Sequence, residues 1–201
     1  MQISHREVKK YVSGKSVIVL GSAPCVANVT ADQLREFNII VRLNNYKHFC
    51  KCHKTDIYYS FFGSSIIKSE QQLKKDGCKF IIHKYPYIDF TKHHKHQDGI
   101  ALDCRDSKYE RDWNIPQYRV PKTNFITNYM MADRMMTTGV SAIVEMIRLG
   151  GNVTIAGFDF FESGIHNLDE KWVSGDGNHN VNKEKEIVDM LEKYEIIKAI
   201  K

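Results

Sequence analysis

Short apolar runs alternate with amphipathic segments along most of the chain. Each apolar run is bounded by turn residues, which is typical of strands buried in a parallel sheet. The predicted strands cover residues 17–20, 38–43, 57–62, 80–83, 153–156 and 196–200.

Helical periodicity fills most of the spaces between these runs. Residues 140–149 place their apolar side chains on one face of a helix that ends at Gly150. Thr30 resembles a helix N-cap, because Gln33 follows it at the spacing of a capping box. The other predicted helices cover residues 4–13, 66–75 and 183–194.

The alternation of strands and helices indicates a doubly wound α/β fold. We expect a single Rossmann-like domain over residues 1–201, with a mainly parallel sheet and helices on both faces. Residues 85–128 have the least regular pattern, so we expect an insertion or lid there. Sheets of this kind bind ligands beyond the carboxyl ends of their strands, where most of the candidate chemistry falls.

The composition, with 42% hydrophobic and 26% charged residues, is that of a folded soluble protein. No apolar run approaches the ~20 residues of a transmembrane helix. Residues 1–10 are too polar for a secretory signal, so we expect a cytoplasmic protein without a transmembrane segment. Five scattered cysteines argue against a disulfide framework.

The net charge of +5 suits a phosphate-bearing ligand or an acidic acceptor, and equally a mildly basic surface. Cys50, Cys52 and His53 lack a second ligand pair at zinc-site spacing, so no metal site is predicted.

Two candidate binding segments follow the first two strands. The first is a tight turn whose backbone amides we expect to face a phosphate or ribose: Gly21, Ser22, Ala23 and Pro24. It lacks the G-x-G-x-x-G dinucleotide fingerprint, and an ordinary strand-to-helix turn explains it equally well. In the second, Arg42 and Asn44 offer donors to a nucleotide; alternatively, Arg42 makes a structural ion pair and Asn44 caps a turn.

Two further segments lie near the later strand. Thr137, Thr138 and Gly139 open the helix of residues 140–149, so their hydroxyls and amides can bind a ligand, cap the helix, or do both. After the strand come Gly157, Phe158 and Asp159. We favour a structural or binding role for the Asp159 carboxylate over general-base chemistry.

His179 lies in a polar, glycine-rich loop before the last predicted helix. An imidazole titrates near neutral pH, so it can take the proton of an attacking hydroxyl group. The alternative is a surface histidine without a role.

In order and spacing, these segments resemble the sialyltransferases, both the animal-type family 29 and the bacterial family 42. The turn at 21–24 with 42–44 resembles the large motif of these enzymes, and 138–139 with 157–159 resembles the small motif. His179 and Glu184 have the H-x4-E spacing of the very short motif.

The resemblance implies a GT-A-like variant of the fold and an inverting transfer from a CMP-sialic-acid-like donor to a glycan hydroxyl. His179 would be the general base, Asn44 and the Ser22 region would hold the ribose and phosphate, and Thr138 and Gly139 would contact ribose or cytosine. It also implies no metal and no cofactor, which agrees with the lack of a D-x-D motif.

The chain departs from the family pattern in several places. Phe161 stands where bacterial members have a tyrosine that steadies the departing phosphate, so His166 or Trp172 would have to serve instead. The cysteine pair of the animal enzymes has no counterpart. A histidine-rich run at 83–96 forms a basic patch that suits an acidic acceptor, a metal or plain solvation.

Two alternatives stay open. One is a glycosyltransferase that uses another nucleotide sugar on a hydroxylated base in DNA, as in phage-type DNA modification. The other is a nucleotide-binding module without catalysis. A His179 ring far from the Thr138 junction would contradict both enzymatic readings.

Overall fold

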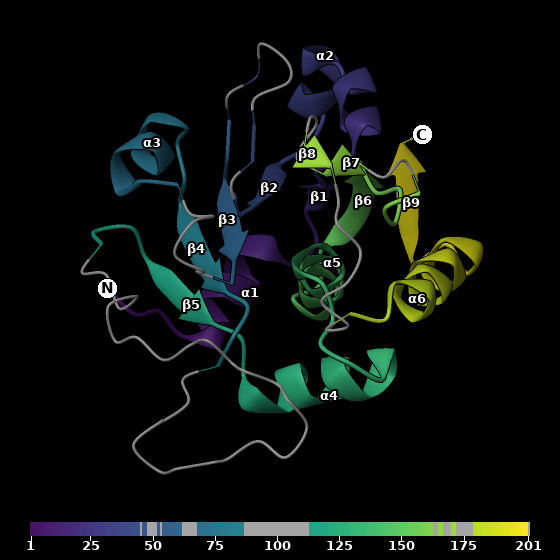
Figure 1. Cartoon of the computed structure of the whole chain (residues 1–201). Coiled ribbons are helices and arrows are strands. Elements are labelled where there is room, and N and C mark those ends of the chain that lie inside the picture. The colour runs from purple at the N-terminus through teal and green to yellow at the C-terminus, as the bar shows by residue number, and fades with distance from the viewer. Residues whose placement is uncertain are drawn as a thin grey trace.

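In a computed structural model, seven parallel strands form one sheet with the order β5-β4-β3-β2-β1-β6-β9 (Figure 1). The strands are β1 Ser16–Leu20, β2 Ile39–Leu43, β3 Ile57–Ser60, β4 Phe80–His83, β5 Gln117–Arg119, β6 Asn152–Ala156 and β9 Ile197–Ile200. A separate antiparallel pair consists of β7 Ile165–His166 and β8 Glu170–Lys171. The structure describes residues 1–44, 46–47, 52, 54–61, 68–86, 113–162, 165–166, 170–171 and 179–200.

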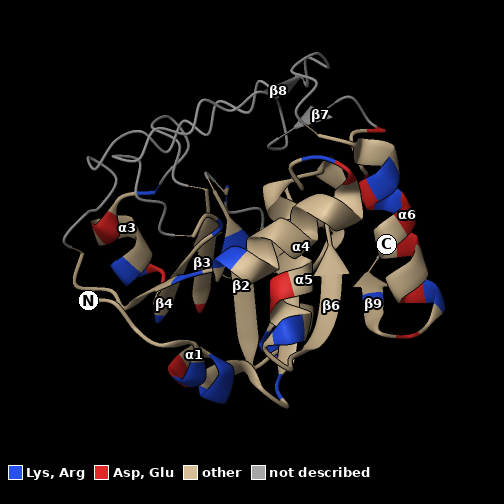
Figure 2. Ribbon diagram, turned by 90° about the horizontal axis from the view of Figure 1, so that it is seen from below, with Lys and Arg blue, Asp and Glu red and all other residues tan. Residues whose placement is uncertain are grey.

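Helices cover both faces of the sheet, as predicted. One face carries α1 His5–Val12, α5 Thr138–Arg148 and α6 Val181–Lys193; the other carries the 3-10 helix η1 Pro24–Asn28, α2 Ala31–Arg35 and α3 Glu70–Lys75 (Figure 1). The remaining helix, α4 Lys122–Ala132, lies over α5 (Figure 2), where Asn124 Nδ2 donates a hydrogen bond to Glu145 Oε2 at 3.3 Å.

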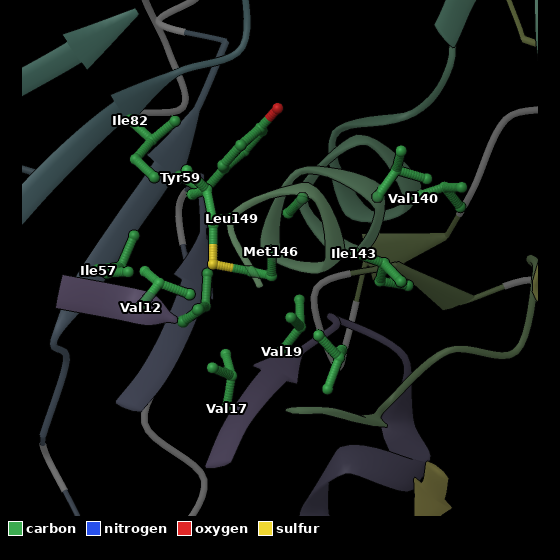
Figure 3. Close-up of a cluster of buried hydrophobic side chains, with 14 of the residues drawn as sticks. Val12, Val17, Val19, Ile57, Tyr59, Ile82, Val140, Ile143, Met146 and Leu149 are labelled. Carbon is green, nitrogen blue, oxygen red and sulfur yellow. The ribbon is translucent and has the colours of Figure 1, made fainter. Parts of the chain in front are cut away.

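The sheet residues divide between two cores because successive strand side chains point to opposite faces. Val17 and Val19 of β1 pack under α5, against Ile143 and Met146 (Figure 3). The intervening Ile18 packs on the opposite face with the residues of η1 and α2. Apolar burial on both faces explains why β1 has no polar alternation.

The helix starts are set by side-chain caps. Ser4 and Glu7 form a reciprocal capping box at the start of α1, and Thr30 and Gln33 form another at α2, as the sequence predicts.

The strand order reverses beside β1. The chain builds β1 to β5 outward in one direction, then returns to place β6 on the other side of β1. In open α/β sheets the usual ligand site lies beyond the carboxyl ends of the strands at such a switch point. The carboxyl ends of β1 and β6 are therefore the place to look for a site.

The predicted strands and helices are confirmed to within a few residues at their ends. In the region 85–128 the structure describes residues 85–86 and 113–128, and the second range holds β5 and the first part of α4. The insertion or lid expected there stays a prediction. Residues 87–112, with most of the histidine-rich run, lie outside the described residues. His83 is not part of an exposed basic patch, because it is buried and its Nε2 lies 2.8 Å from Gln117 Oε1.

Candidate functional site

The loops after β1 and β6 are in direct backbone contact. The amide of Gly21 donates to Ala156 O at 2.8 Å, and the amide of Ala23 donates to Gly157 O at 3.1 Å. A Cβ atom on Gly21 would lie 2.0 Å from Gly157 O, so only glycine permits this approach. The expectation that the amides of Gly21 and Ala23 face a ligand is therefore wrong, because both donate to the carbonyl oxygens of Ala156, the last residue of β6, and Gly157, the residue after it.

Phe158 fills the space between the turn after β1 and the first turn of α5. Its ring lies so close to Gly21 and Gly139 that a Cβ atom on these residues would stand 3.2 Å and 2.6 Å from ring carbons. The two glycines and the aromatic ring thus form one packing unit. Gly139 and Phe158 have a structural role that explains their presence without a ligand contact.

Asn44 ends β2 at the same edge in a left-handed conformation, with φ of 43°. Its Oδ1 accepts hydrogen bonds from Ser60 Oγ at 3.1 Å and from the amide of Phe61 at 3.4 Å. These contacts orient the carboxamide group. No acceptor for its Nδ2 is found among the described residues, so this group keeps two donors for a ligand.

Arg42 has a structural position instead. Its side chain is 1% exposed, and its guanidinium donates to the carbonyl oxygens of Lys54 at 3.2 Å and Cys52 at 3.0 Å. The guanidinium also stacks on the ring of Tyr46, with its Cζ 5.3 Å from the centroid. Arg42 holds the backbone at Cys52 and Lys54 beside β2, so it is not a candidate ligand contact.

Thr137 caps the N-terminus of α5, which is one of the two roles that the sequence left open for this segment, capping and ligand binding. The Thr137 hydroxyl oxygen accepts from the amide of Val140 at 3.4 Å. The amides of Thr138 and Gly139 stand in the first turn, where a helix offers them no partner, and none is found among the described residues. Their N–H groups point out of the N-terminal end of the helix, where a phosphate or hydroxyl ligand can accept hydrogen bonds from them.

Glu184 ties α6 to this helix start. Its carboxylate accepts from the amide of Thr137 at 2.7 Å and from the Thr137 hydroxyl at 2.5 Å. The residue is 1% exposed, and burial raises the pKa of its carboxyl group above the usual value. The Thr137 hydrogen bonds and the charge of Lys84 lower the same pKa.

His179 lies beside the segment that leads into α5. Its Nδ1 is 2.5 Å from the carbonyl oxygen of Met135, two residues before the cap Thr137. Since a carbonyl only accepts, Nδ1 carries the proton in this contact, and in the neutral ring Nε2 keeps its lone pair. The ring is partly buried and contacts the segment that leads to Thr138. A ring far from Thr138 would have contradicted the enzymatic hypotheses, and the ring is not far from it.

The loop after β6 is held by its own aspartate. Asp159 Oδ1 accepts from the amide of Phe161 at 3.0 Å. Phe160 and Phe161 both have positive φ, 51° and 65°, which bulky residues rarely adopt. Asp159 therefore stabilises a strained turn, which is the first of the two roles, structural or binding, that the sequence favoured for it.

The remaining predicted residues are partly placed. Ser22 and Pro24 stand in the turn after β1, where Pro24 begins η1. His166 is placed through its backbone in β7 only, and Trp172 lies outside the described residues. Whether either contacts a phosphate stays a prediction.

Two residues of the site were missed in the sequence. Tyr85 follows β4, and its hydroxyl lies 2.8 Å from Met135 Sδ. Lys84 stands between β4 and Tyr85, is 3% exposed, and contributes the charge that acts on Glu184. The sequence could have indicated both residues, because they directly follow the carboxyl end of the predicted strand at 80–83.

Neither a metal site nor a membrane-spanning helix is found in the described part of the chain. No group of three or more His, Cys, Asp or Glu side chains with the arrangement of a metal site occurs there. No helix in that part is long and apolar enough to span a bilayer.

Solved structures of mammalian sialyltransferases have the same fold. One, in complex with Gal-beta-1-3GalNAc-ortho-nitrophenol, matches with a TM-score of 0.57 and 14% identity over 96% of this chain and 71% of that chain. A second matches with a TM-score of 0.56 and 13% identity over 98% of this chain and 77% of the other. No protein-family model and no curated protein sequence matches the chain. The likeness shows a sialyltransferase-like fold, as the motif order predicted.

Proposed function

We propose that the chain is an inverting glycosyltransferase that transfers a sugar from a CMP-sialic-acid-like donor to an acceptor hydroxyl group, with His179 as general base. The shared fold of the mammalian sialyltransferases supports a glycosyltransferase. The donor, the base and the reaction are inferred from the residues at the carboxyl edge of the sheet.

The observation that carries the proposal is the contact between His179 Nδ1 and the Met135 carbonyl oxygen, at 2.5 Å. A base must present an unprotonated nitrogen in a defined direction. The carbonyl holds the proton on Nδ1 and orients the ring, so Nε2 can take the proton of an acceptor hydroxyl as it attacks the anomeric carbon. The nucleoside monophosphate then leaves from the opposite face, which inverts the configuration.

Two sets of hydrogen-bond donors at the same edge of the sheet support the binding of the sugar nucleotide. Asn44 offers its Nδ2 hydrogens, and the first turn of α5 offers the amides of Thr138 and Gly139. Neutral donors of this kind suit a nucleoside monophosphate and its ribose, which need orientation more than charge compensation. The proposal therefore requires no metal ion.

The test is the release of CMP from CMP-sialic acid, in the presence of an acceptor, by the wild type and two histidine variants. His179→Ala should lower kcat by about 10²–10⁴-fold, the usual contribution of a general base. His5→Ala is the matched control, because His5 bonds Tyr118 on the α1 side and lies outside the site. Turnover of His179→Ala equal to that of the control contradicts the proposed base.

Ligand choice is tested by thermal shift with CMP, CDP, UMP, UDP and GDP. At about 100-fold its dissociation constant, a ligand adds about 2.7 kcal/mol of stability. Stabilisation by CMP above the other nucleotides supports the proposed donor. A preference for uridine or guanine nucleotides instead supports the alternative enzyme that modifies DNA, and binding without turnover supports the non-catalytic module.

A further inference from the structure

The segment between α4 and α5 carries the carbonyl group that orients His179. His179 Nδ1 lies 2.5 Å from Met135 O, and Thr137 caps α5 two residues later. Among the described residues, no backbone–backbone hydrogen bond to Met135 or Met136 is found. The direction of the Met135 carbonyl group therefore depends on contacts of side chains.

The side chain of Met135 is held by Tyr85, the second residue after β4. The Tyr85 hydroxyl group and Met135 Sδ lie 2.8 Å apart. A thioether sulfur only accepts hydrogen bonds, so the hydroxyl group is the donor. Met135 is thus in contact at both ends, through its sulfur with Tyr85 and through its carbonyl oxygen with His179.

The ring of Tyr85 is itself fixed by two neighbours. It packs edge-on against Phe125 of α4, with centroids 5.5 Å apart and an angle of 64° between the planes. Lys84 Nζ lies 5.3 Å from the same ring centroid. These contacts restrict the ring, and so they define the position from which the hydroxyl group reaches the sulfur.

We propose that Tyr85 is a positioning residue that, through Met135, aims the Met135 carbonyl group at His179 Nδ1 and so keeps the lone pair on Nε2. The chain of contacts from Tyr85 to His179 stands without the proposed function, whereas its effect on catalysis rests on it. Without the Tyr85 hydroxyl group the Met135 carbonyl group loses its fixed direction, and His179 exchanges between its two neutral tautomers. The Nε2–H tautomer has no lone pair on Nε2 and does not act as the base.

The test is the tautomer of His179 in ligand-free protein. Nitrogen–proton correlation spectra across two bonds report it at about pH 8, above the ordinary pKa of an imidazole. The His179 signals are assigned by their loss in His179→Gln. The wild type should show the Nδ1–H tautomer alone, whereas Tyr85→Phe should lose this purity and show both tautomers.

Two further variants separate the hydroxyl contact from packing. Met135→Leu removes the sulfur at nearly constant volume, so it should mix the tautomers as Tyr85→Phe does. Tyr11→Phe is the matched control, because Tyr11 also packs edge-on against a phenylalanine, with centroids 4.6 Å apart, but that residue is Phe80 at the amino end of β4. This control should keep the single tautomer of the wild type.

A single Nδ1–H tautomer in either Tyr85→Phe or Met135→Leu overturns the proposal, and so does a wild type that lacks this tautomer. If Tyr85→Phe fails to fold, Met135→Leu removes the same contact from its other end and decides the question.

Turnover of CMP-sialic acid with an acceptor tests the consequence for catalysis. Tyr85→Phe should lower kcat by about 10–100-fold at a nearly unchanged KM, since a displaced base weakens the chemical step more than binding. The double variant with Met135→Leu should lose no more than either single variant, because both remove one contact. A kcat of Tyr85→Phe equal to that of Tyr11→Phe overturns the catalytic part. A wild type without turnover contradicts the proposed function and leaves the tautomer comparison valid.

Discussion

Replacement of Gly21 by alanine tests the packing on which the site is built. The added Cβ would stand 2.0 Å from Gly157 O and 2.7 Å from Gly157 C, both backbone atoms that no rotamer change can move. The loops after β1 and β6 must separate. Forced overpacking costs about 1–3 kcal/mol. The hydrogen bonds from Gly21 to Ala156 and from Ala23 to Gly157 are then lost or stretched, at about 1 kcal/mol each.

The sum is a destabilisation of about 3–5 kcal/mol, a large part of the 5–15 kcal/mol that holds a typical domain. In a chain of this size it lowers Tm by about 6–20 °C. Urea unfolding followed by circular dichroism, together with a thermal scan, measures both quantities. CMP binding should weaken in parallel, because Ser22 and Pro24 follow the same junction.

Gly14→Ala is the control. Gly14 has φ of 74°, but a Cβ atom there meets nothing within 4 Å, so only backbone strain of about 1–2 kcal/mol is expected. A Tm loss in Gly21→Ala no larger than that in Gly14→Ala would refute the close contact between the two loops. An unchanged CMP affinity in a strongly destabilised Gly21→Ala would instead contradict the prediction that the ligand binds beside this junction.

Three further predictions follow from the site. Gly139→Ala should destabilise the protein because its Cβ would meet Phe158 Cε1 at 2.6 Å, and adding Phe158→Leu should recover part of the loss in a double-mutant cycle of unfolding free energies. Asn44→Asp keeps an acceptor for Ser60 but removes the Nδ2 donors, so CMP titration should show at least a 10-fold weaker affinity while Tm changes little. Burial and the charge of Arg119 lower the pKa of His83 to about 3, so its imidazole NMR signals should not titrate between pH 5 and 8. Because the folded state resists this proton, the contribution of His83 to stability should fall as pH drops below about 6.5, and His83→Asn should remove that dependence.

The sheet was predictable where strands are buried on both faces. The runs that became β1, β2, β4 and β6 are apolar at nearly every position, and turn residues mark their ends. The edge strand β5 was missed because Gln117–Arg119 is short and mostly polar. The helix α4 was missed because Lys122–Ala132 mixes threonine, asparagine and aromatic residues without a clear apolar stripe.

The site was predictable in its residue types and less so in their partners. The H-x4-E spacing marked both His179 and Glu184, and in the structure these two residues contact Met135 and Thr137, just before α5. The hydrogen-bond acceptors of the Gly21 and Ala23 amides come from the end of β6, which is far away in sequence but pairs with β1. In the same way, the role of Arg42 depends on the carbonyl groups of Cys52 and Lys54, which lie outside its own strand. Such contacts between distant segments leave no local pattern.

The product of the reaction tests the central claim most directly. Wild-type protein, CMP-sialic acid and a galactoside acceptor are incubated together, and proton NMR follows the anomeric configuration of the newly formed bond over time. Single displacement with His179 as base predicts a product of inverted configuration whose rate of formation falls by about 10²–10⁴-fold in His179→Ala. A product of retained configuration, or a rate that His179→Ala leaves unchanged, would contradict this account.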